Sequence, residues 1–557
     1  MVLVFFSWLL MLVFFIPTGI LLKKIFSIKI NDFSITVFCG MFLQCFLISI
    51  ACFFTNIGFE FFVFNALFNV FFIFIFKSEI ISCSKLIVKE IQNISSQSKF
   101  LLLIILISSC YKCSLKPFLI DNESYYIQTI KWINEYGFVK GLANLHVFLA
   151  QTSPFHVLQA GFNFSFLNDN FNDINGFVLV IASIFFIVKS EEYYKMNNKF
   201  HWLNFVLIFN VLFFQFINQP SPDFVLIVLS QIIFYLFIEK NQYSDAKKVA
   251  IILFLFMFFV KITIVPIGLL IFIWVIKSKK QLILYFGSGF VIFLVLFFKN
   301  AIISGFPCYP FNFLSINVDW KLPQNIFDFL SVTKNSGYFE NKVILNPSFY
   351  QKILGWLQLS GMNRFFNLGM ILLFGIALFF KKIRSDKNYL SLYIVLLIHF
   401  IILIFISPQF RFFLPEFVFF TVLIISNIFN YLKFNFKIVQ ILLIIFITFS
   451  SIFIEFIDFK KLTSNTLLHS HNYFQIKNLL VPEPNSKYDY LKFEKIKNGN
   501  LEYYSPTENF FFFGTANGEL PCVNKVQIEY LEKYYFVKPQ MRTNKLKDGF
   551  YCKIIKK

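Results

Sequence analysis

Charged residues are scarce in this sequence. Lys, Arg, Asp and Glu together make up 14% of its 557 residues, whereas a soluble domain carries about a quarter. Hydrophobic residues make up 57% of the chain, and the mean hydropathy is +0.69. So few charges cannot cover a water-soluble surface of this size. The composition therefore predicts an all-α polytopic membrane protein whose first partner is the lipid bilayer.

Several motifs are absent as well, and each absence excludes a class of protein. There is no Walker P-loop, which excludes an energy-coupling ATPase within this chain. There is no GxSxG or HExxH motif either. The net charge is +20, but no basic stripe interleaves with aromatic residues outside the apolar runs, so we expect no nucleic-acid partner. Acidic residues are rare inside the apolar runs, which argues against a proton relay or a cation-coupled transporter.

Apolar runs long enough to cross a bilayer, about 20 residues each, recur along the chain. The run from Val249 to Ile276 is too long for one span and has Lys261 near its middle. A charge at the bilayer centre costs about 2.5–3.5 kcal/mol, and two short helices that meet at Lys261 near the membrane surface avoid this cost. We therefore expect about fourteen spans. The other twelve are Val2–Leu22, Phe33–Phe54, Gly58–Phe76, Phe100–Leu119, Ile174–Val188, Trp202–Ile217, Phe224–Ile238, Leu282–Phe298, Phe365–Phe380, Tyr389–Ile406, Phe412–Tyr431 and Ile438–Phe456.

Every second loop between these spans is rich in Lys and Arg. Cytoplasmic loops collect these residues, so we expect the basic loops inside and both termini on the periplasmic or external side of a bacterial plasma membrane. The basic residues are Lys23, Lys24 and Lys29; Lys77, Lys85, Lys89 and Lys99; Lys189, Lys195 and Lys199; Lys240, Lys247 and Lys248; Lys277, Lys279 and Lys280; Lys381, Lys382, Arg384 and Lys387; and Lys433 and Lys437.

This alternation divides the chain into three parts. The parts are 1–99, with three spans and a basic loop; 100–457, a transmembrane core with long external loops at 120–172 and 299–364; and 458–557, a small external domain. Loops of such length are usually functional. If the last part lies outside, Cys522 and Cys552 can form a disulfide there.

Two acidic residues follow directly on the fourth predicted span. Asp121 and Glu123 open the first long external loop. In one interpretation they cap the following helix and interact with its dipole. In the other they jointly hold a proton or a divalent cation, Mg or Mn. Tyr126, Ile130 and Ile133 form an apolar face on that helix, which suits a helix lying in the membrane interface.

Other ionisable residues are expected on the same membrane face. Asp223 follows two prolines at the mouth of a span, where it either caps the helix or lines a site. Lys261 lies between two apolar half-spans, and an ionisable residue at such depth is a functional candidate. Arg411 either clamps a phosphate or anchors a helix end on lipid head groups. The candidates for contacts with substrate are His146, His156, Asp223, Tyr309, Asp319 and Trp320.

The order of these features resembles the GT-C superfamily, polytopic glycosyltransferases that use polyprenyl-phosphate-linked donors. The resemblance rests on a span, an acidic Asp-x-Glu at its external exit, and amphipathic helices before the chain re-enters the membrane. It implies that Asp121 is the general base and that Glu123 tunes its pKa or shares a divalent cation with it. It also implies that Lys261 and Arg411 bind the donor phosphate.

A narrower resemblance covers most of the chain from about residue 100 onward. Residues 120–146, with the segment KWINEYGFVKGLANLH, are similar to an uncharacterised family of bacterial multi-pass membrane proteins. The sequence departs from that family at Tyr126, where a His is usual, and at Thr152–Phe155. Its tail also lacks a first Cys-Trp pair, which argues against a disulfide there. Further matching segments are Ser221-Pro222-Asp223, 304–310, 318–321, 409–412 and Leu520-Pro521-Cys522.

These features predict an enzyme that moves a sugar from a polyprenyl-phosphate-linked donor to a glycan or lipid acceptor on the external face. Two alternatives stay open. An O-antigen polymerase or ligase has the same topology but depends on external Arg and His. A flippase or transporter of lipid-linked glycans needs a central cationic cavity, for which Lys261 is the one candidate.

Overall fold

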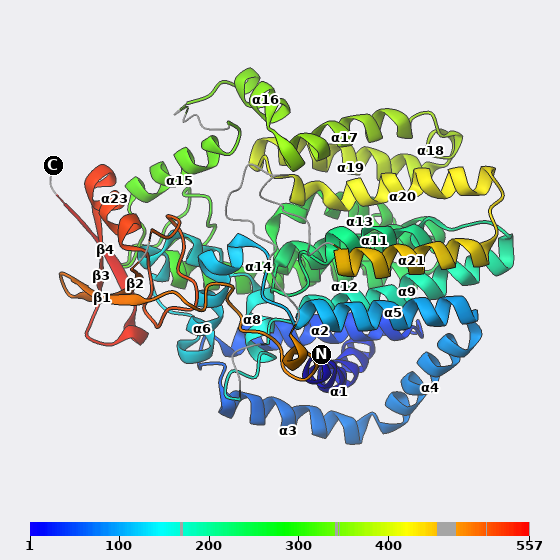
Figure 1. The fold of residues 1–557 in the computed structure, drawn as a ribbon, viewed down its shortest axis with the longest axis horizontal. Helices are drawn as coiled ribbons and strands as arrows, with labels where there is room; N and C mark the ends of the chain where they lie inside the picture. Colours follow the sequence, from blue (N-terminus) through cyan, green and yellow to red (C-terminus); the bar gives the residue numbers. More distant parts are fainter. Residues whose placement is uncertain (168–170, 340–343, 345, 454–474, 508, 556–557) are drawn as a thin grey trace.

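A computed structural model of the chain describes residues 1–167, 171–339, 344, 346–453, 475–507 and 509–555. Long apolar helices run side by side through most of the molecule, and a smaller region with short strands lies at one end, on the left of Figure 1. The described helices are α1 (Val2–Ile25), α2 (Phe33–Ala51), α3 (Phe59–Ile75), α4 (Lys77–Asn93), α5 (Ser96–Cys113), η1 (Asn122–Tyr126), α6 (Ile127–Tyr136), α7 (Leu142–Leu145), η2 (Val147–Gln151), α8 (Pro154–Gly161), α9 (Ile174–Asn197), η3 (Trp202–Phe209), α10 (Asn210–Phe213), α11 (Pro222–Glu239), α12 (Ser244–Val260), η4 (Ile262–Ile267), α13 (Gly268–Val275), α14 (Lys279–Ser304), α15 (Gln324–Ser336), α16 (Phe349–Gln358), α17 (Gly361–Ala377), α18 (Lys381–Ser385), α19 (Lys387–Ile406), η5 (Phe410–Phe413), α20 (Leu414–Tyr431), α21 (Phe436–Phe453), η7 (Ile476–Leu479), α23 (Lys525–Tyr535) and η8 (Leu546–Asp548).

Among the described residues, 8 helices are long and apolar enough to cross a membrane, and up to 10 spans result if each of two bent helix pairs counts as one. The eight are α1, α2, α9, α11, α14, α19, η5 with α20, and α21; the bent pairs are α3 with α4, at 87°, and α16 with α17, at 111°. The chain is therefore a multi-pass integral membrane protein.

The number of candidate spans is smaller than the expected fourteen. Four predicted spans form helices that are too short or too polar to qualify, because a span needs about 20 apolar residues. They are α5, with polar first and last turns, η3 with α10, α12, and η4 with α13. All four still contribute buried residues to the bundle core.

The expected break at Lys261 is confirmed. Helix α12 ends at Val260, Lys261 is extended (φ −158°, ψ 128°), and the chain continues in η4 and α13. Near the start of α12, Lys247 Nζ donates to the carbonyl of Trp274 in α13 at 3.1 Å. Because the start of one segment thus contacts the end of the other, the chain reverses direction at Lys261.

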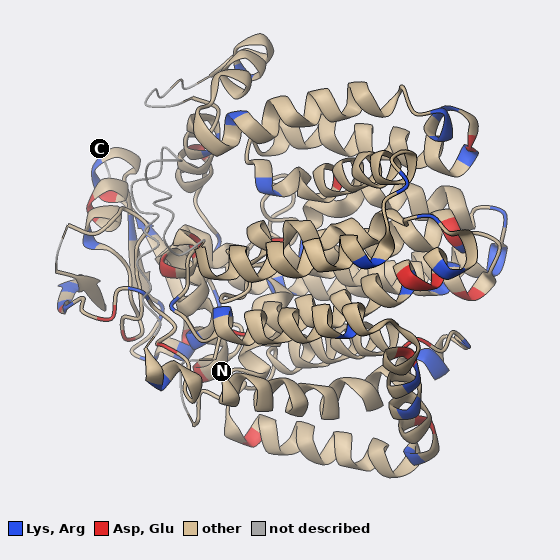
Figure 2. Cartoon of the chain, turned by 45° about the vertical axis from the view of Figure 1, so that its right-hand side comes forward, with Lys and Arg blue, Asp and Glu red and all other residues tan. Residues whose placement is uncertain are grey.

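The predicted basic loops all meet at one end of the bundle. Contacts join the first loop to the second and fourth, the third to the second and seventh, and the fourth to the fifth and sixth. The joining pairs are Lys24–Glu79, Lys29–Asp245, Ser95–Glu191, Phe200–Asn430, Ser244–Gln281 and Asn241–Asn388. In Figure 2 the charged residues gather mainly at the two ends of the bundle, and the stretch between them is almost uncharged.

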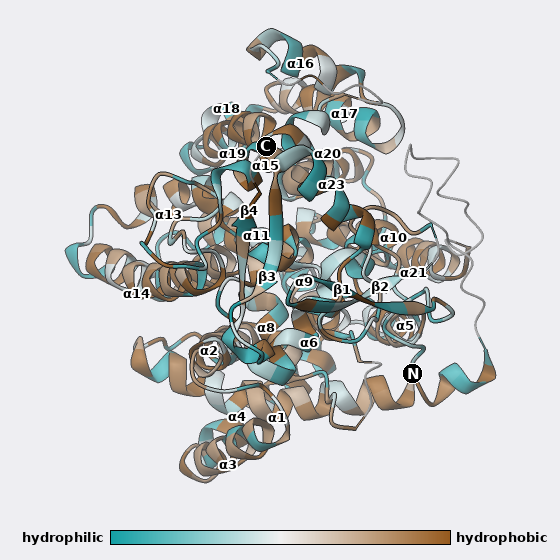
Figure 3. Cartoon of the chain, turned by 90° about the vertical axis from the view of Figure 1, so that its left-hand side faces the viewer, coloured by the Kyte–Doolittle hydropathy of each residue, from teal (hydrophilic) through white to brown (hydrophobic). Residues whose placement is uncertain are grey.

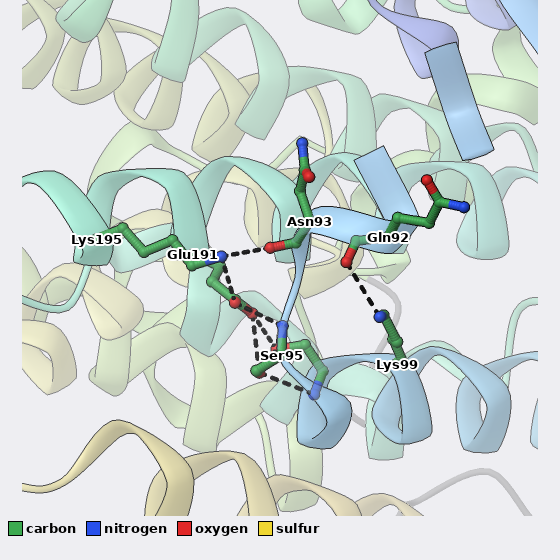
Figure 4. A network of polar contacts seen from close by, with 7 residues as sticks. Gln92, Asn93, Ser95, Lys99, Glu191 and Lys195 are labelled. Atoms are coloured by element: carbon green, nitrogen blue, oxygen red, sulfur yellow. Dashed lines mark hydrogen bonds and ion pairs between the residues drawn. The ribbon is translucent and has the colours of Figure 1, made fainter. Parts of the chain in front are cut away.

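One of these junctions is centred on Glu191 (Figure 4). Its buried carboxylate accepts from the Ser95 amide at 2.6 Å and from the Ser98 hydroxyl at 2.5 Å, and it pairs with Lys195 at 3.0 Å. These bonds hold the start of α5 against the end of α9. The Glu191 carboxylate can be buried among the basic loops because these several donors offset its lost hydration.

The C-terminal region covers the opposite end of the bundle. Its described residues form four short strands, so the fold is not entirely α-helical as the composition predicted. Strands β1 (Phe493–Asn498) and β2 (Leu501–Pro506) form one antiparallel hairpin, and β3 (Val537–Met541) and β4 (Phe550–Ile554) form another. Figure 3 looks onto this end and shows its more hydrophilic strands in front of the hydrophobic helices. The N-terminus lies here too, since the Met1 amine donates to the Asn478 carbonyl at 2.6 Å. Residues 458–474 of the expected external domain lie outside the described part.

The segment after Asp121 is buried instead of lying exposed in the membrane interface. Ile130 and Ile133 of α6 pack in the core of the bundle, and Trp132 packs in a second core shared with the C-terminal region. Helix α6 therefore joins the two parts of the molecule. The C-terminal cysteines are unpaired: Cys522 lies near the Thr515 carbonyl and Cys552 near that of Asn144.

Candidate functional site

Two acidic and two basic residues from four distant segments meet at the end of the bundle that carries the C-terminal region. Arg411 bonds to Asp121 through Nη1, and its Nε lies 3.3 Å from the Asp223 carboxylate. The other oxygen of Asp223 pairs with Lys261 Nζ. The four side chains thus form a chain of alternating charge, Asp121–Arg411–Asp223–Lys261, with no net charge. We call it the ion-pair chain.

Each of these four residues lies where a helix begins or ends. Asp121 precedes the π-helical turn η1, but its side chain makes no capping bond. Asp223 is in the first turn of α11, directly after Pro222. Arg411 lies in the short turn η5 before α20, and Lys261 separates α12 from η4. Polar side chains are tolerated there because helix ends in a membrane protein approach the polar surface.

Burial distinguishes the two acids. The Asp223 side chain is 3% exposed and lies between both cations, whereas those of Asp121, Arg411 and Lys261 are 20%, 21% and 25% exposed. A buried carboxylate is stable only when cations and donors surround it. Asp223 therefore holds the two cations together, and Asp121 is the more accessible of the two acids.

The site is closed in this structure. The cavity beneath the ion-pair chain has a volume of about 10 Å³ and is lined by residues that include Thr263, Ile264 and Pro415. That is about the space of one water molecule. Lys261 Nζ also lies 3.9 Å from the centre of the Phe412 ring, a cation–π contact. A substrate with a phosphate must therefore separate the ion pairs to enter.

His156 lies close to the ion-pair chain, next to two tyrosines. Its ring centre is 4.7 Å from that of Tyr126 and 6.0 Å from that of Tyr125. Burial, together with the nearby charges of Lys299 and Lys261, lowers the pKa of His156 to about 3. The ring is therefore neutral and serves as a hydrogen-bonding group.

Glu123 lies away from Asp121 and holds the C-terminal region. Its fully buried carboxylate accepts from the Ser486 hydroxyl at 2.6 Å and from the Lys487 amide at 3.1 Å. Its backbone carbonyl accepts from the amides of Thr515 and Ala516. Burial raises the pKa of Glu123, and these donors partly oppose the rise. The two acids of the Asp-x-Glu motif therefore have different partners.

The acids do not form a shared metal site. Asp121 faces Arg411, and both oxygens of Glu123 are occupied by protein donors. Within the part of the chain that the structure describes, no group of three His, Cys, Asp or Glu residues could hold a metal ion. The arrangement does not fit the Mg or Mn that the Asp-x-Glu motif suggested.

The remaining predicted residues contact the C-terminal region. His146 lies 3.3 Å from the Phe513 carbonyl through Nε2. Asp319 pairs with Arg542 at 2.7 Å, and Arg542 also lies 4.8 Å from the Trp320 ring centre. Tyr309 is buried in the same second core. None of these contacts involves the ion-pair chain.

Two ionisable residues inside the helices were missed by the sequence analysis. His399 of α19 bonds to Glu416 of α20 through Nδ1, and its Nε2 lies 3.0 Å from the Thr263 carbonyl. Their side chains are 1% and 0% exposed. The sequence could have identified both residues, because each lies in an apolar run, where an ionisable residue is a functional candidate.

Comparison with known proteins identifies a family for this chain. No curated protein and no solved structure matches the chain significantly. Residues 1–419, which include all four members of the ion-pair chain, match a family described only as a domain of unknown function, DUF8201. The chain therefore belongs to the DUF8201 family. The expectation of an uncharacterised multi-pass family is met in part, because the expected likeness began at about residue 100 and extended into the C-terminal region, whereas the match covers residues 1–419.

Proposed function

We propose that this chain is a glycosyltransferase that moves a sugar from a polyprenyl-phosphate-linked donor to a glycan or lipid acceptor at the external face of the membrane. The observation that carries the proposal is the ion-pair chain. Its two cations lie at the end of the bundle beside a partly exposed carboxylate, and a phosphate and a hydroxyl acceptor need such groups side by side.

The donor phosphate binds Arg411 and Lys261 and takes the place of Asp121 beside Arg411, while Asp223 stays bound to both cations. Guanidinium groups bind phosphate through paired hydrogen bonds. Asp121 then loses its bond to Arg411, and its carboxylate oxygens are free to accept the proton of the acceptor hydroxyl.

The transfer itself needs one proton acceptor and one stabilised leaving group. Asp121 takes the proton of the acceptor hydroxyl, and the acceptor oxygen forms a bond to the anomeric carbon. The bond from that carbon to the phosphate oxygen breaks, and its electron pair leaves with the polyprenyl phosphate. Arg411 and Lys261 offset the charge of this leaving group. The configuration at the anomeric carbon is inverted.

An apolar groove beside the site supports a lipid-linked donor. It has a volume of about 480 Å³ and lies between α12, η4 and α14. Its lining is almost entirely Phe and aliphatic residues, and it includes Val265, four residues after Lys261. We propose that the isoprenoid chain of the donor occupies it, because an apolar chain needs an apolar surface continuous with the bilayer.

Asp121→Asn tests the proposal in a strain whose own copy of the gene is deleted. We expect the variant to accumulate in the membrane and to fail to restore the surface glycan. Asp328→Asn, an exposed acid on α15, is the matched control and should restore it. Unchanged glycan with Asp121→Asn would contradict the proposal. Loss of chain length alone would indicate a polymerase, and lipid movement across liposomes without sugar transfer would indicate a flippase.

A further inference from the structure

Lys299 is a buried cation without a carboxylate partner in the described part of the chain. It lies near the end of α14 and is 6% exposed. Its Nζ donates to the Thr152 carbonyl at 2.5 Å, which leaves two N–H groups for other acceptors. A buried charge costs several kcal/mol unless an anion offsets it. This position therefore favours a negatively charged ligand.

His156 offers an unused donor in the same place. Its Nδ1 accepts from the Ser153 amide at 3.3 Å, so the proton of the neutral ring is on Nε2. His156 is fully buried, and Nε2 has no hydrogen-bond partner among the residues that the structure describes. Buried donors are nearly always paired, and an unpaired one beside a site indicates a missing acceptor.

These two groups lie next to the Lys261 end of the ion-pair chain. Thr152 binds Lys299, and the hydroxyl of the adjacent Ser153 donates to the Val260 carbonyl at 2.8 Å, directly before Lys261. The ion-pair chain has two acids and two cations, so Lys299 leaves the whole cluster with one surplus positive charge.

We propose that Lys299 and His156 form a second anion site that takes the second phosphate of a diphosphate-linked donor. Arg411 and Lys261 bind one phosphate, and the surplus cation and the free donor beside them bind the other. The inference rests on the proposed function and narrows its substrate class from lipid phosphates in general to polyprenyl diphosphates.

Binding of farnesyl phosphate and farnesyl diphosphate to the detergent-purified full chain tests this site. We expect the wild-type chain to bind the diphosphate about tenfold or more tightly than the monophosphate. Lys299→Gln should reduce that preference to about twofold or less and leave monophosphate binding nearly unchanged. Lys280→Gln, an exposed lysine at the other end of the same helix, is the control and should keep the preference.

The outcomes separate the two proposals. If the wild-type chain binds neither probe, the proposed function fails and the second site with it. If it binds both equally, or if folded Lys299→Gln keeps the preference, only the second anion site is overturned. If Lys299→Gln is not recovered as monodisperse protein, His156→Phe replaces it, since a phenyl ring can still pack on Tyr126 and lacks the Nε2 donor. A preference retained in His156→Phe overturns the site as well.

Discussion

Arg411 pairs with both acids of the ion-pair chain. Its guanidinium reaches Asp121 through Nη1 and Asp223 through Nε. The planar group offers five donors in a fixed geometry, whereas a lysine ammonium is a single point charge. Arg411 can therefore exchange Asp121 for a phosphate without releasing Asp223.

Arg411→Lys should retain the charge and lose most of the activity. An ammonium lacks the planar pair of N–H groups that holds a phosphate through two parallel hydrogen bonds, so we expect sugar transfer to fall about a hundredfold, corresponding to about 2.7 kcal/mol. Radiolabelled transfer into the glycan by membranes measures this. Arg384→Lys, on an exposed residue of α18, should have no effect. Activity within twofold of wild type in Arg411→Lys would contradict the role of the bridging guanidinium.

Glu123 has a structural role that Asp121, two residues before it, does not share. Its carboxylate and its carbonyl together bind the segments around Ser486 and Thr515. Removal of a buried acceptor leaves its donors unsatisfied. The Asp-x-Glu motif thus combines the residue proposed to act as the base with a residue that attaches the C-terminal region.

Glu123→Ala should release the C-terminal region. We expect a loss of about 3 kcal/mol of stability, because the Ser486 hydroxyl and the Lys487 amide lose their acceptor. Limited proteolysis of the purified chain, with the melting temperature, measures the effect. Glu529→Ala, on an exposed residue of α23, is the control. A protease-resistant C-terminal region in Glu123→Ala would show that other contacts suffice to hold it.

At the scale of elements, α14 differs from the other spans. Only 11% of its most apolar 18-residue segment is buried, against 89% of the corresponding segment of α11. It packs on α12, where the ring centres of Phe254 and Tyr285 are 5.9 Å apart, and the apolar groove lies between α12, η4 and α14. An exposed span at the edge of a bundle leaves room for lipid.

Gly289→Trp should block the groove. A Cβ at Gly289 lies 3.7 Å from Leu255 of α12, whereas one at Gly287 meets nothing within 4 Å. We expect Gly289→Trp to raise the KM for a long-chain donor about tenfold, because the indole occupies the site of the isoprenoid, and to leave the melting temperature unchanged. Gly287→Trp places the same side chain on the lipid side and should behave as wild type. Equal kinetics for the two variants would place the lipid chain elsewhere.

At the scale of the whole molecule, the C-terminal region is attached to the bundle through buried polar contacts. His146 is one of them: Nδ1 accepts from the Phe148 amide at 3.2 Å and Nε2 faces the Phe513 carbonyl. Burial lowers the pKa of His146 to about 4. A proton on Nδ1 would face the Phe148 N–H and break that hydrogen bond. Protonation of His146 therefore opposes the attachment of the C-terminal region to the bundle.

Acid should therefore loosen this attachment. The pKa of His146 is lower in the folded state than its usual value of about 6.5, so its contribution to stability is complete above about pH 6.5 and is lost as the pH falls towards 4. The full difference is about 3 kcal/mol. We expect the melting temperature to fall between pH 7.5 and 4.5 by less in His146→Gln than in the wild type. Identical pH profiles would exclude His146 as the cause.

The membrane class, the common end of the basic loops and the reversal at Lys261 followed from the sequence. These properties depend on local hydropathy and on the cost of burying charge, which a run of about 20 residues reveals. The same reasoning placed Asp121, Asp223, Lys261 and Arg411 among the candidates, since each lies at a predicted span end.

Only the tertiary structure decided which of these residues meet. Asp121 pairs with Arg411, 290 residues away in the sequence, and not with Glu123, because neighbouring residues on a helical turn point in different directions. The His399–Glu416 pair and the position of Lys299 beside His156 likewise depend on the rotation and packing of whole helices. Hydropathy assigns a residue to a depth in the membrane, and helix packing alone determines its partner.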